Sequence, residues 1–271
     1  MNGVTKNIAI IGCGNIGGSI ANGLVASGEI KPDSVYLTKR NGKSLDKFSE
    51  RGFKTTSDNV EAVKNAGIII IAVTPQQLDE ILFQIKENLD PLKHIVMSVV
   101  SGATIDQMRS KIGNDTPVIR VMPNTAIAIQ ESMTCISANP ENKNELKLAV
   151  EIFDKLGKTV VIHEDLMVPA TALCACGIAF FMRAIRAASQ GGIEIGFHAE
   201  DALFMAAQTA KGAAAMIIEG GNHPEREVDK VTTPQGCTIA GLNQMEHSGF
   251  SSSLIKGIVT SAQKADTLYS K

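Results

Sequence analysis

The sequence predicts a two-part chain, with an N-terminal α/β Rossmann domain followed by an all-helical C-terminal domain. Short apolar runs alternate with amphipathic stretches up to about residue 163, which is typical of a mostly parallel, doubly wound sheet. Beyond that point strand-like runs give way to long, Ala-rich stretches with helical periodicity. We therefore expect two domains, residues 1–163 and residues 164–271.

Apolar runs predict the strands of the first domain, and helical spacing predicts the helices between them. The expected strands are residues 7–11, 35–38, 67–73, 94–100 and 118–121. The expected helices are residues 16–27, 44–50, 59–65 and 76–88. The run GIIIIAV at 67–73 is apolar throughout, as in a strand buried on both faces.

Three long helices are expected in the second domain, at residues 165–190, 199–219 and 251–269. The stretch AAQTAKGAAAMI carries small side chains that allow helices to approach closely, which suits a helix–helix interface as well as a core. No Pro- or Ser-rich linker separates the domains. We expect a continuous helix to join them, and the helical domain to serve dimerisation.

Composition excludes several classes of partner. The 271 residues carry a formal net charge of -2, with no basic cluster and no Trp, which argues against nucleic acid and anionic membranes. Residues 1–6 are polar and do not resemble a signal peptide, and the apolar stretch 170–182 is too short to span a bilayer. The five cysteines favour a reduced, cytoplasmic protein. Cys174 and Cys176 are interpreted as small buried side chains and not as zinc ligands, and no metal is expected.

The stretch IAIIGCGNIGGSI contains a dinucleotide-binding fingerprint between an expected strand and an expected helix. Gly12 permits the tight turn, Gly14 lets the backbone approach a pyrophosphate, and Gly17 lets the helix pack against the strand. Asn15 and Ile16 lie at the helix N-terminus, which offers free N–H groups to phosphates. The alternative is a glycine-rich turn without a ligand.

The end of the second expected strand indicates which dinucleotide binds. An acidic residue about 20 residues past the glycines would bind the 2′-hydroxyl of NAD. Thr38, Lys39, Arg40 and Asn41 stand there, and none is acidic. Two cations beside a hydroxyl favour a 2′-phosphate, so NADPH is the expected cofactor and NADH the alternative one. Solvated loop charges are the competing interpretation of Lys39 and Arg40.

Near the C-terminus, VTTPQGCTIAGL interrupts the helical pattern with several hydroxyls and a glycine. We expect residues 233–238 to form a carboxylate cradle at a helix start, with Pro234 in its first turn. The N–H groups of Gly236, Cys237 and Thr238 would then point outward, unpaired, as an anion site. The alternative is a helix–helix turn in which Thr232 or Thr233 caps the helix and no ligand binds.

These segments resemble the pyrroline-5-carboxylate reductase family along almost the whole chain. The N-terminal resemblance lies in GCGNIG, SDNVEAV, AVTPQ, MSVVSG and RVMPNT, and the C-terminal one in TALCACGIAFF and VTTPQGCTIAGL. RVMPNT and the second half of VTTPQGCTIAGL are the most specific of these motifs.

The resemblance implies NADPH-dependent reduction of 1-pyrroline-5-carboxylate to L-proline, the last step of proline biosynthesis. It also implies an interlocked homodimer, which assembles further in some members. By this resemblance, the residues expected to contact the cofactor are Gly12, Gly14, Asn15, Ile16, Gly17, Thr38, Lys39, Arg40, Asn59, Ala72, Val73, Thr74, Pro75, Met122, Pro123 and Asn124. The substrate maps onto Cys176, Gly177, Thr233, Gly236, Cys237 and Thr238, and Thr238 is the expected catalytic contact because its hydroxyl could reach the ring nitrogen.

Some positions depart from the family pattern. Thr74 replaces the usual Lys of AVKPQ, residues 174–178 lose two Ser, one Gly and the Pro of TALSGSGPAY, and TPQGCT replaces SPGGTT. Polar small side chains near the substrate have therefore become less polar. Either the pocket is a variant that takes the same substrate, or it has drifted to a related imine.

Hydride transfer to an iminium needs little from side chains, because the cofactor carries the difficult step. His163, Glu164 and Asp165 are the one cluster of ionisable types that includes a His, and helix capping is their expected role. Two other functions remain open. A 3-hydroxyacid-type dehydrogenase would need a catalytic Lys in the first long helix, and residues 165–190 contain none. A non-catalytic nucleotide-binding protein with a degenerate substrate site would be consistent with the altered residues 174–178.

Overall fold

The computed structural model describes residues 7–40, 42–113 and 115–269, with only the backbone of residues 42 and 43 described. The predictions for Asn41 and for residues 1–6 lie outside these residues. The chain forms two compact units, residues 1–176 with 261–271, and residues 177–260. These units divide the chain at a different place from the predicted domains, because the helical segment up to Cys176 and the last residues of the chain pack with the sheet.

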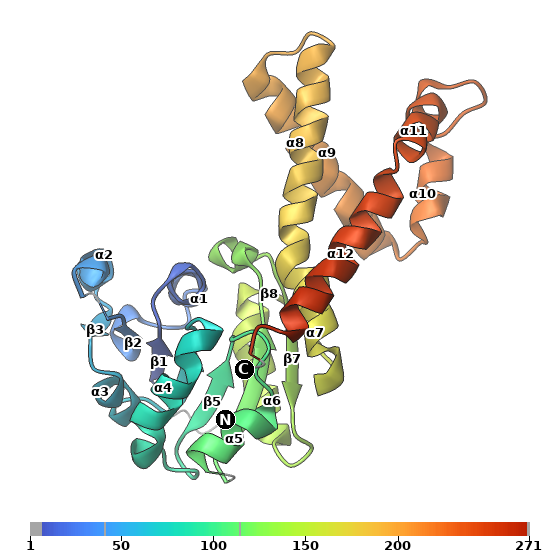
Figure 1. Ribbon diagram of the computed structural model, residues 1–271. Helices are drawn as coiled ribbons and strands as arrows, with labels where there is room; N and C mark the ends of the chain where they lie inside the picture. The colour runs from blue at the N-terminus through green and yellow to red at the C-terminus, as the bar shows by residue number, and fades with distance from the viewer. Residues whose placement is uncertain (1–6, 41, 114, 270–271) are drawn as a thin grey trace. The chain divides into compact units, whose positions relative to one another are not determined.

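The first unit is built on one eight-stranded sheet in the order β3-β2-β1-β4-β5-β6-β7-β8 (Figure 1). All neighbouring strands are parallel except β6 and β7. The strands are β1 (Ile8–Ile11), β2 (Val35–Thr38), β3 (Lys54–Thr56), β4 (Ile68–Ile71), β5 (Ile95–Ser98), β6 (Val118–Met122), β7 (Ser132–Ala138) and β8 (Gly157–Val161). This order confirms the predicted Rossmann-type sheet.

Helices cover both faces of the sheet. On one face, α1 (Asn15–Ala26) and α6 (Lys143–Phe153) pack against alternate strand residues such as Ile10 and Ile70. On the other face, α3 (Asn59–Lys64), α4 (Pro75–Ile85) and α5 (Ile105–Ile112) pack against the intervening residues, such as Ile69 and Ile71. A β-strand turns successive side chains to opposite faces, so the unbroken isoleucine run of β4 supplies both cores.

Short helices complete the first unit. The α-helical ones are α2 (Asp46–Ser49) and α7 (Met167–Ala170), and the others are η1 (Pro32–Ser34), η2 (Gly42–Leu45), η3 (Lys86–Asn88), η4 (Thr125–Ile129), η5 (Asp154–Leu156), η6 (Glu164–Leu166) and the π-helical η7 (Thr171–Cys176). The predicted helix 44–50 is therefore wrong in length, because η2 and α2 are each a single turn. The sequence patterns did not predict β3, β7, β8, α5 or α6.

The second unit is entirely helical, as predicted. It contains α8 (Gly177–Glu194), α9 (Ala199–Gly220), α10 (Pro224–Lys230) and α11 (Cys237–His247), and α12 (Phe250–Asp266) begins in it and ends in the first unit. α8 and α9 pack against each other (Figure 1). The chain is helical without a break from α7 through η7 to α8, as expected for two domains joined by a continuous helix.

One part of the helical sequence is more apolar than the sequence analysis recognised. The helical stretch Glu164–Glu194 is long and apolar enough to cross a membrane by length and composition alone. The apolar helical stretch is therefore longer than the expected segment, residues 170–182. Such a stretch also suits a helix whose apolar face packs against another protein chain.

Candidate functional site

Two glycines of the fingerprint hold positions that no other residue could take without a clash. Gly12 follows β1 with a φ of 98°, and a Cβ there would lie 2.5 Å from the Ala72 carbonyl oxygen. A Cβ on Gly17 would collide with the Gly12 carbonyl oxygen. The turn between β1 and α1 is therefore as tight as the fingerprint predicts.

The N-terminus of α1 is open to solvent. Gly14 is the N-cap residue, it is exposed, and a Cβ built on it would meet nothing within 4 Å. Among the described residues, no side chain caps the first-turn N–H groups of Asn15, Ile16 and Gly17. An exposed turn of free N–H groups at a helix N-terminus is an anion-binding arrangement.

The end of β2 is tied directly to this turn. The Thr38 carbonyl accepts hydrogen bonds from the N–H groups of Gly12, at 3.2 Å, and Cys13, at 2.8 Å. The buried Thr38 hydroxyl donates to Asn59 Oδ1 at 2.6 Å, and Asn59 Nδ2 donates to Gln84 Oε1 at 2.9 Å. Both side chains are thus bonded to the protein, and sequence reasoning missed Gln84 because its role arises only when α3 and α4 lie together.

Lys39 and Arg40 follow Thr38 at the rim of this turn. Within the described residues, no hydrogen bond or ion pair occupies either cation, and Arg40 is exposed. Burial raises the pKa of the Cys13 thiol, and the charge of Lys39 partly opposes that shift, which indicates that Lys39 lies close to the glycine turn. Two free cations beside a helix N-terminus form a local positive field for a phosphorylated ligand.

The segment after β4 forms a second helix start at the same edge of the sheet. Thr74 is the N-cap of α4 and Pro75 its first residue, and Gln77 completes a capping box with Thr74. Ala72 lies against Gly12 and Val73 is half-buried. β1 and β4 are neighbours whose connections leave in opposite directions, and the carboxyl ends of strands at such a switch point are where ligands bind in open α/β sheets.

The segment after β6 is buried and extensively bonded. Met122, Pro123 and Asn124 are all buried. The Asn124 amide oxygen accepts from the Ala126 N–H at 3.0 Å, its Nδ2 donates to the Cys174 carbonyl at 3.3 Å, and its backbone N–H donates to Ser132 Oγ at 3.1 Å. Asn124 therefore joins the end of β6 to the π-helical segment η7.

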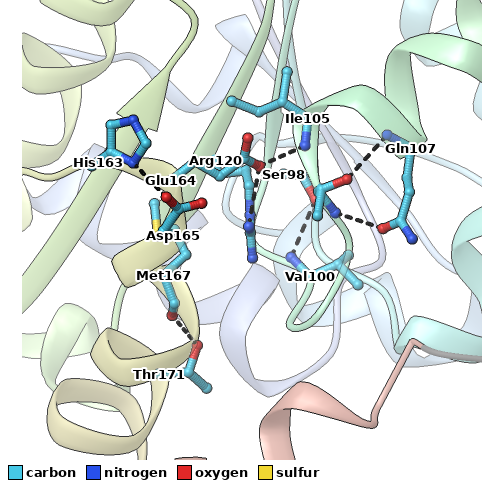
Figure 2. Close-up of polar contacts among 11 residues, drawn as sticks. Ser98, Val100, Ile105, Gln107, Arg120, His163, Glu164, Asp165, Met167 and Thr171 are labelled. Carbon is cyan, nitrogen blue, oxygen red and sulfur yellow. Dashed lines mark hydrogen bonds and ion pairs between the residues drawn. The ribbon is translucent and has the colours of Figure 1, made fainter.

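A buried ion pair fixes the start of the helical segment (Figure 2). Arg120 on β6 is 4% exposed, and its Nη1 lies 3.2 Å from Glu164 Oε1. The same oxygen accepts the N–H of Ile105, the first residue of α5, at 2.7 Å. Burial lowers the pKa of Arg120, and the carboxylate of Glu164 opposes this shift. The expected capping role of residues 163–165 is therefore corrected, because His163 makes no capping bond and Glu164 serves the N-terminus of α5 instead.

The predicted substrate residues lie on two segments. Cys176 ends the π-helical segment η7 and is half-buried, and Gly177 begins α8 and is buried. Thr171 Oγ1 bonds to the Met167 carbonyl at 2.8 Å within the same helical run. A π-helical turn is rare and occurs often at functional sites, and no residue pattern in this segment predicts it.

The structure corrects the predicted carboxylate cradle in two details and also tests the capping alternative. α11 begins at Cys237 with Gly236 as N-cap, so Pro234 lies outside the helix. The Gly236 N–H donates to the Thr233 carbonyl at 2.9 Å, so it is paired, and residues 233–236 form a tight turn. Thr232 Oγ1 donates to the Val228 carbonyl at 2.8 Å, and no side chain caps α11, which excludes the capping alternative.

What remains of the cradle is the open N-terminus of α11. No side chain caps it, and the exposed Cys237 and the half-buried Thr238 lie in its first turn. In the turn before it Gln235 has a φ of 59°, the left-handed region, where the family pattern has Gly. These residues belong to the second unit, whereas the cofactor segments belong to the first.

Sequence reasoning thus located most of this arrangement. The structure brings the ends of β1, β2 and β4 to one edge of the sheet, where the predicted cofactor residues before Met122 lie. The sequence did not predict the role of Gln84, the Arg120–Glu164 pair, or the neighbouring thiols of Cys135 and Cys174, whose sulfur atoms lie 3.8 Å apart. Among the described residues, no group of three or more His, Cys, Asp or Glu could hold a metal ion.

The fold and this edge of the sheet define a dinucleotide-binding oxidoreductase of the Rossmann class. Residues 7–102 match the family described as NADP oxidoreductase coenzyme F420-dependent, and residues 164–268 match the family described as pyrroline-5-carboxylate reductase dimerisation.

Individual relatives point to one family. Pyrroline-5-carboxylate reductase 1 of Dictyostelium discoideum is 54% identical over 98% of this chain, which spans 50% of that relative's length. Pyrroline-5-carboxylate reductase 2 of the same organism is 50% identical over 96% of this chain and 92% of its own. This chain belongs to the pyrroline-5-carboxylate reductase family.

A solved structure agrees in fold. The pyrroline carboxylate reductase of Plasmodium falciparum, a crystal structure with NADP bound, has a TM-score of 0.90. It is 24% identical, and the match covers 98% of this chain and 99% of that one. The agreement extends through both the sheet and the helices.

Proposed function

We propose that this chain catalyses the NADPH-dependent reduction of 1-pyrroline-5-carboxylate to L-proline, the last step of proline biosynthesis. The observation that carries the proposal is 50% identity to a pyrroline-5-carboxylate reductase along 92% of that relative, together with an intact glycine fingerprint. The enzyme is an oxidoreductase that acts on a CH–NH bond.

NADPH occupies the sheet edge where β1, β2 and β4 end. The N–H groups of residues 15–17 hold the pyrophosphate, because the helix N-terminus is open and uncapped. Lys39 and Arg40 pair with the 2′-phosphate. The segments 72–75 and 122–124 complete the site, and Thr38 and Asn59 act mainly through the bonds that hold the glycine turn.

The substrate carboxylate binds at the N-terminus of α11. The N–H groups of Cys237 and Thr238 hold it, with Thr233 and Gly236 shaping the turn beside them. The Thr238 hydroxyl contacts the ring nitrogen of the imine, and Cys176 and Gly177 are the other residues that we assign to the substrate. The altered side chains at these positions are less polar but leave the backbone donors in place.

The chemistry needs orientation more than acid–base catalysis. The cofactor, when bound, supplies a hydride from C4 of its nicotinamide to the imine carbon. This chain fixes the distance and alignment of the two rings, holds the carboxylate, and offers the Thr238 hydroxyl at the nitrogen. Within the described residues no metal centre is available, and the helical run Met167–Glu194 carries no Lys, which counts against a 3-hydroxyacid-type dehydrogenase.

Homo-oligomerisation follows from the dimerisation family match at residues 164–268. We take the working domains to be a cofactor domain at 1–163 and a dimerisation and substrate domain at 164–271, and the basic assembly to be a homodimer. A cytoplasmic location remains a prediction from the free cysteines.

The test is a purified-protein assay that follows the loss of NADPH absorbance with 1-pyrroline-5-carboxylate. We expect turnover with this substrate, a preference for NADPH over NADH, and L-proline as product by mass spectrometry. A 3-hydroxyacid with NADP⁺ serves as the matched comparison and should give no reaction. NADPH binding without turnover on the imine would instead favour the non-catalytic alternative.

A further inference from the structure

Two cysteines that are distant in sequence face each other behind the predicted substrate segment. Cys135 lies on β7 and Cys174 lies in the π-helical segment η7, and their sulfur atoms are 3.8 Å apart. Both residues belong to the first unit. Cys135 is 3% exposed, whereas Cys174 is half-buried. One residue of the pair is therefore partly exposed and the other is buried.

Packing holds the pair in this arrangement. Cys135 belongs to a small apolar cluster with Met122, Met167 and Ala170, and Cys174 packs against that cluster. The Cys174 carbonyl also accepts the hydrogen bond from Asn124 Nδ2 at 3.3 Å. β7 is bonded to a strand on each side, so the Cys135 sulfur is fixed by the sheet.

We propose that Cys135 and Cys174 form an oxidative modification site, at which a low-molecular-weight disulfide such as glutathione disulfide converts the two thiols into an intramolecular disulfide. The proximity of the two sulfurs, one on a partly exposed residue and one on a buried residue, supplies an attacking thiol and a resolving thiol.

The exchange balances in two steps. The Cys174 thiolate attacks one sulfur of glutathione disulfide, which forms a mixed disulfide and releases one glutathione thiolate that takes up a proton. The Cys135 thiol then loses its proton and attacks the Cys174 sulfur, which forms the Cys135–Cys174 bond and releases the second glutathione. Two protein thiols are oxidised, and the disulfide of the reagent is reduced to two thiols.

The electrostatics favour Cys174 as the attacking group. The hydrogen bond from Cys135 lowers the pKa of Cys174 to about 7, and the same bond together with burial raises the pKa of Cys135. A substantial fraction of Cys174 is therefore thiolate at neutral pH.

Bond formation would displace the helical segment more than the sheet. A disulfide has a sulfur–sulfur distance of about 2.0 Å, so the two sulfurs must approach each other. The π-helical turn is the more deformable side, because a π-bulge already interrupts the regular helix bonding. Cys176 and Gly177 follow directly, so we expect the disulfide to disturb the substrate segment. This last step depends on the proposed function.

Mass spectrometry of the full-length protein is the primary test. The reduced protein is incubated with glutathione disulfide, the remaining thiols are alkylated, and the digest is examined for linked peptides. We expect a Cys135–Cys174 link that a dithiol reductant removes. Alkylation of both residues after long incubation, or a link from Cys174 to Cys176, would overturn the proposal.

The matched variant is Cys135→Ser, which removes the resolving thiol. In this variant the reaction of Cys174 should stop at the mixed disulfide with glutathione, whereas in wild type it should proceed to the Cys135–Cys174 disulfide. Equal glutathione retention on Cys174 in both proteins would contradict the inference. The wild-type peptide map needs no variant, so the test holds even if Cys135→Ser folds poorly.

The turnover of the enzyme provides a separate test. The oxidised wild type should lose most of its turnover and recover it on reduction. A disulfide that forms without any loss of turnover would refute the coupling to residues 176 and 177. Because the peptide map does not use activity, failure of the proposed reaction in the reduced enzyme is distinguishable from failure of the modification site.

Discussion

Thr38, Asn59 and Asn124 already have side chains bonded to the protein, whereas Lys39 and Arg40 have no partner among the described residues. This difference separates two kinds of contribution to cofactor binding. The bonded residues shape the edge of the sheet, and the free cations are available to a ligand charge. Substitution of the cations should therefore change cofactor choice with little effect on folding.

The double variant Lys39→Gln with Arg40→Gln tests this assignment. A charge-assisted hydrogen bond is worth about 1.5–3 kcal/mol, so NADPH affinity should fall by at least about tenfold. NADH lacks the 2′-phosphate, and its affinity should hardly change. The measurement is titration of both cofactors, with Lys47→Gln on α2 as the control. An unchanged NADPH/NADH ratio in the double variant would refute the role of these cations.

Thr238→Ala tests the substrate contact. Loss of one hydrogen bond to the substrate should lower kcat/KM by about 5–150-fold, which corresponds to about 1–3 kcal/mol. NADPH affinity should stay near wild type, because its contacts lie on other segments. Thr232→Ala is the control, since its hydroxyl bonds to the Val228 carbonyl and should affect stability instead. Normal kcat/KM in Thr238→Ala would exclude this residue from the site.

Gln235 carries a local backbone cost in the turn before α11. Its φ of 59° is unfavourable for a side chain with a Cβ, and Gly would remove that strain. Gln235→Gly should raise stability by about 1 kcal/mol, measured by urea denaturation at fixed protein concentration. Gln244→Gly, within the exposed part of α11, should lower it by about as much. Destabilisation by both variants would show that the turn is not strained.

At the scale of elements, the sequence predicts strands that are continuously apolar and misses strands that are half-exposed or rich in polar side chains. β4 is a run of four isoleucines and was predicted directly. β3 and β8 lie toward the sheet edge and are half-exposed, and β7, SMTCISA, is buried but rich in small polar side chains. Such strands carry no periodic apolar signal, because their burial is decided by neighbours that only the folded chain supplies.

The residues of the candidate site also differ in whether the sequence alone predicts their role. Gly12 and Gly17 were predictable because their role is local to one turn. The pairing of Arg120 with Glu164 was not, since 44 residues separate them and only the sheet and η6 bring them together. The π-helical form of η7 was equally unpredictable, because no residue pattern marks it and its contacts with β6 and β7 exist only in the folded chain.

Glu164→Gln tests whether that pair stabilises the junction of β6, α5 and the helical segment. The variant keeps an oxygen for the Ile105 N–H but leaves the buried Arg120 charge without a counter-charge. We expect a loss of about 3 kcal/mol in stability by urea denaturation. Glu141→Gln, which alters the exposed ion pair with Arg109, should have a much smaller effect, because solvent screens that pair. Equal effects of the two variants would contradict the importance of burial.

At the scale of the whole molecule, the helical unit has too little core to be stable as it stands. α8 contributes Gly177 and Ser189 as buried residues, α9 contributes Ala202, and α10 and α11 contribute none. Large apolar side chains are exposed on these helices instead, among them Phe204 at 72% and Ile218 at 77%. Exposed apolar surface of this extent marks an interaction site, in agreement with the dimerisation family match.

We therefore predict an obligate dimer whose contacts come from the helical unit. Burial of a large apolar side chain contributes about 1.5–3 kcal/mol, and each substitution occurs twice in a symmetric dimer. Phe204→Asp should thus weaken association by about 3 kcal/mol or more, which is over a hundredfold in Kd. Light scattering across a dilution series should show monomers of the variant at concentrations where wild type is dimeric, with turnover lost in parallel.

Leu92→Asp is the matched control for this experiment. Leu92 is an apolar side chain that is 97% exposed, but it lies in the sheet unit, outside the dimerisation segment. The Leu92→Asp substitution should leave both the assembly and the turnover unchanged. A wild-type protein that remains monomeric at micromolar concentration, or a Phe204→Asp variant that associates as tightly as wild type, would show that the exposed apolar face of the helices does not form the interface. The α11 N-terminus that we assign to the substrate belongs to this same helical unit. A variant that no longer associates but keeps its turnover would therefore show that catalysis does not require the dimer.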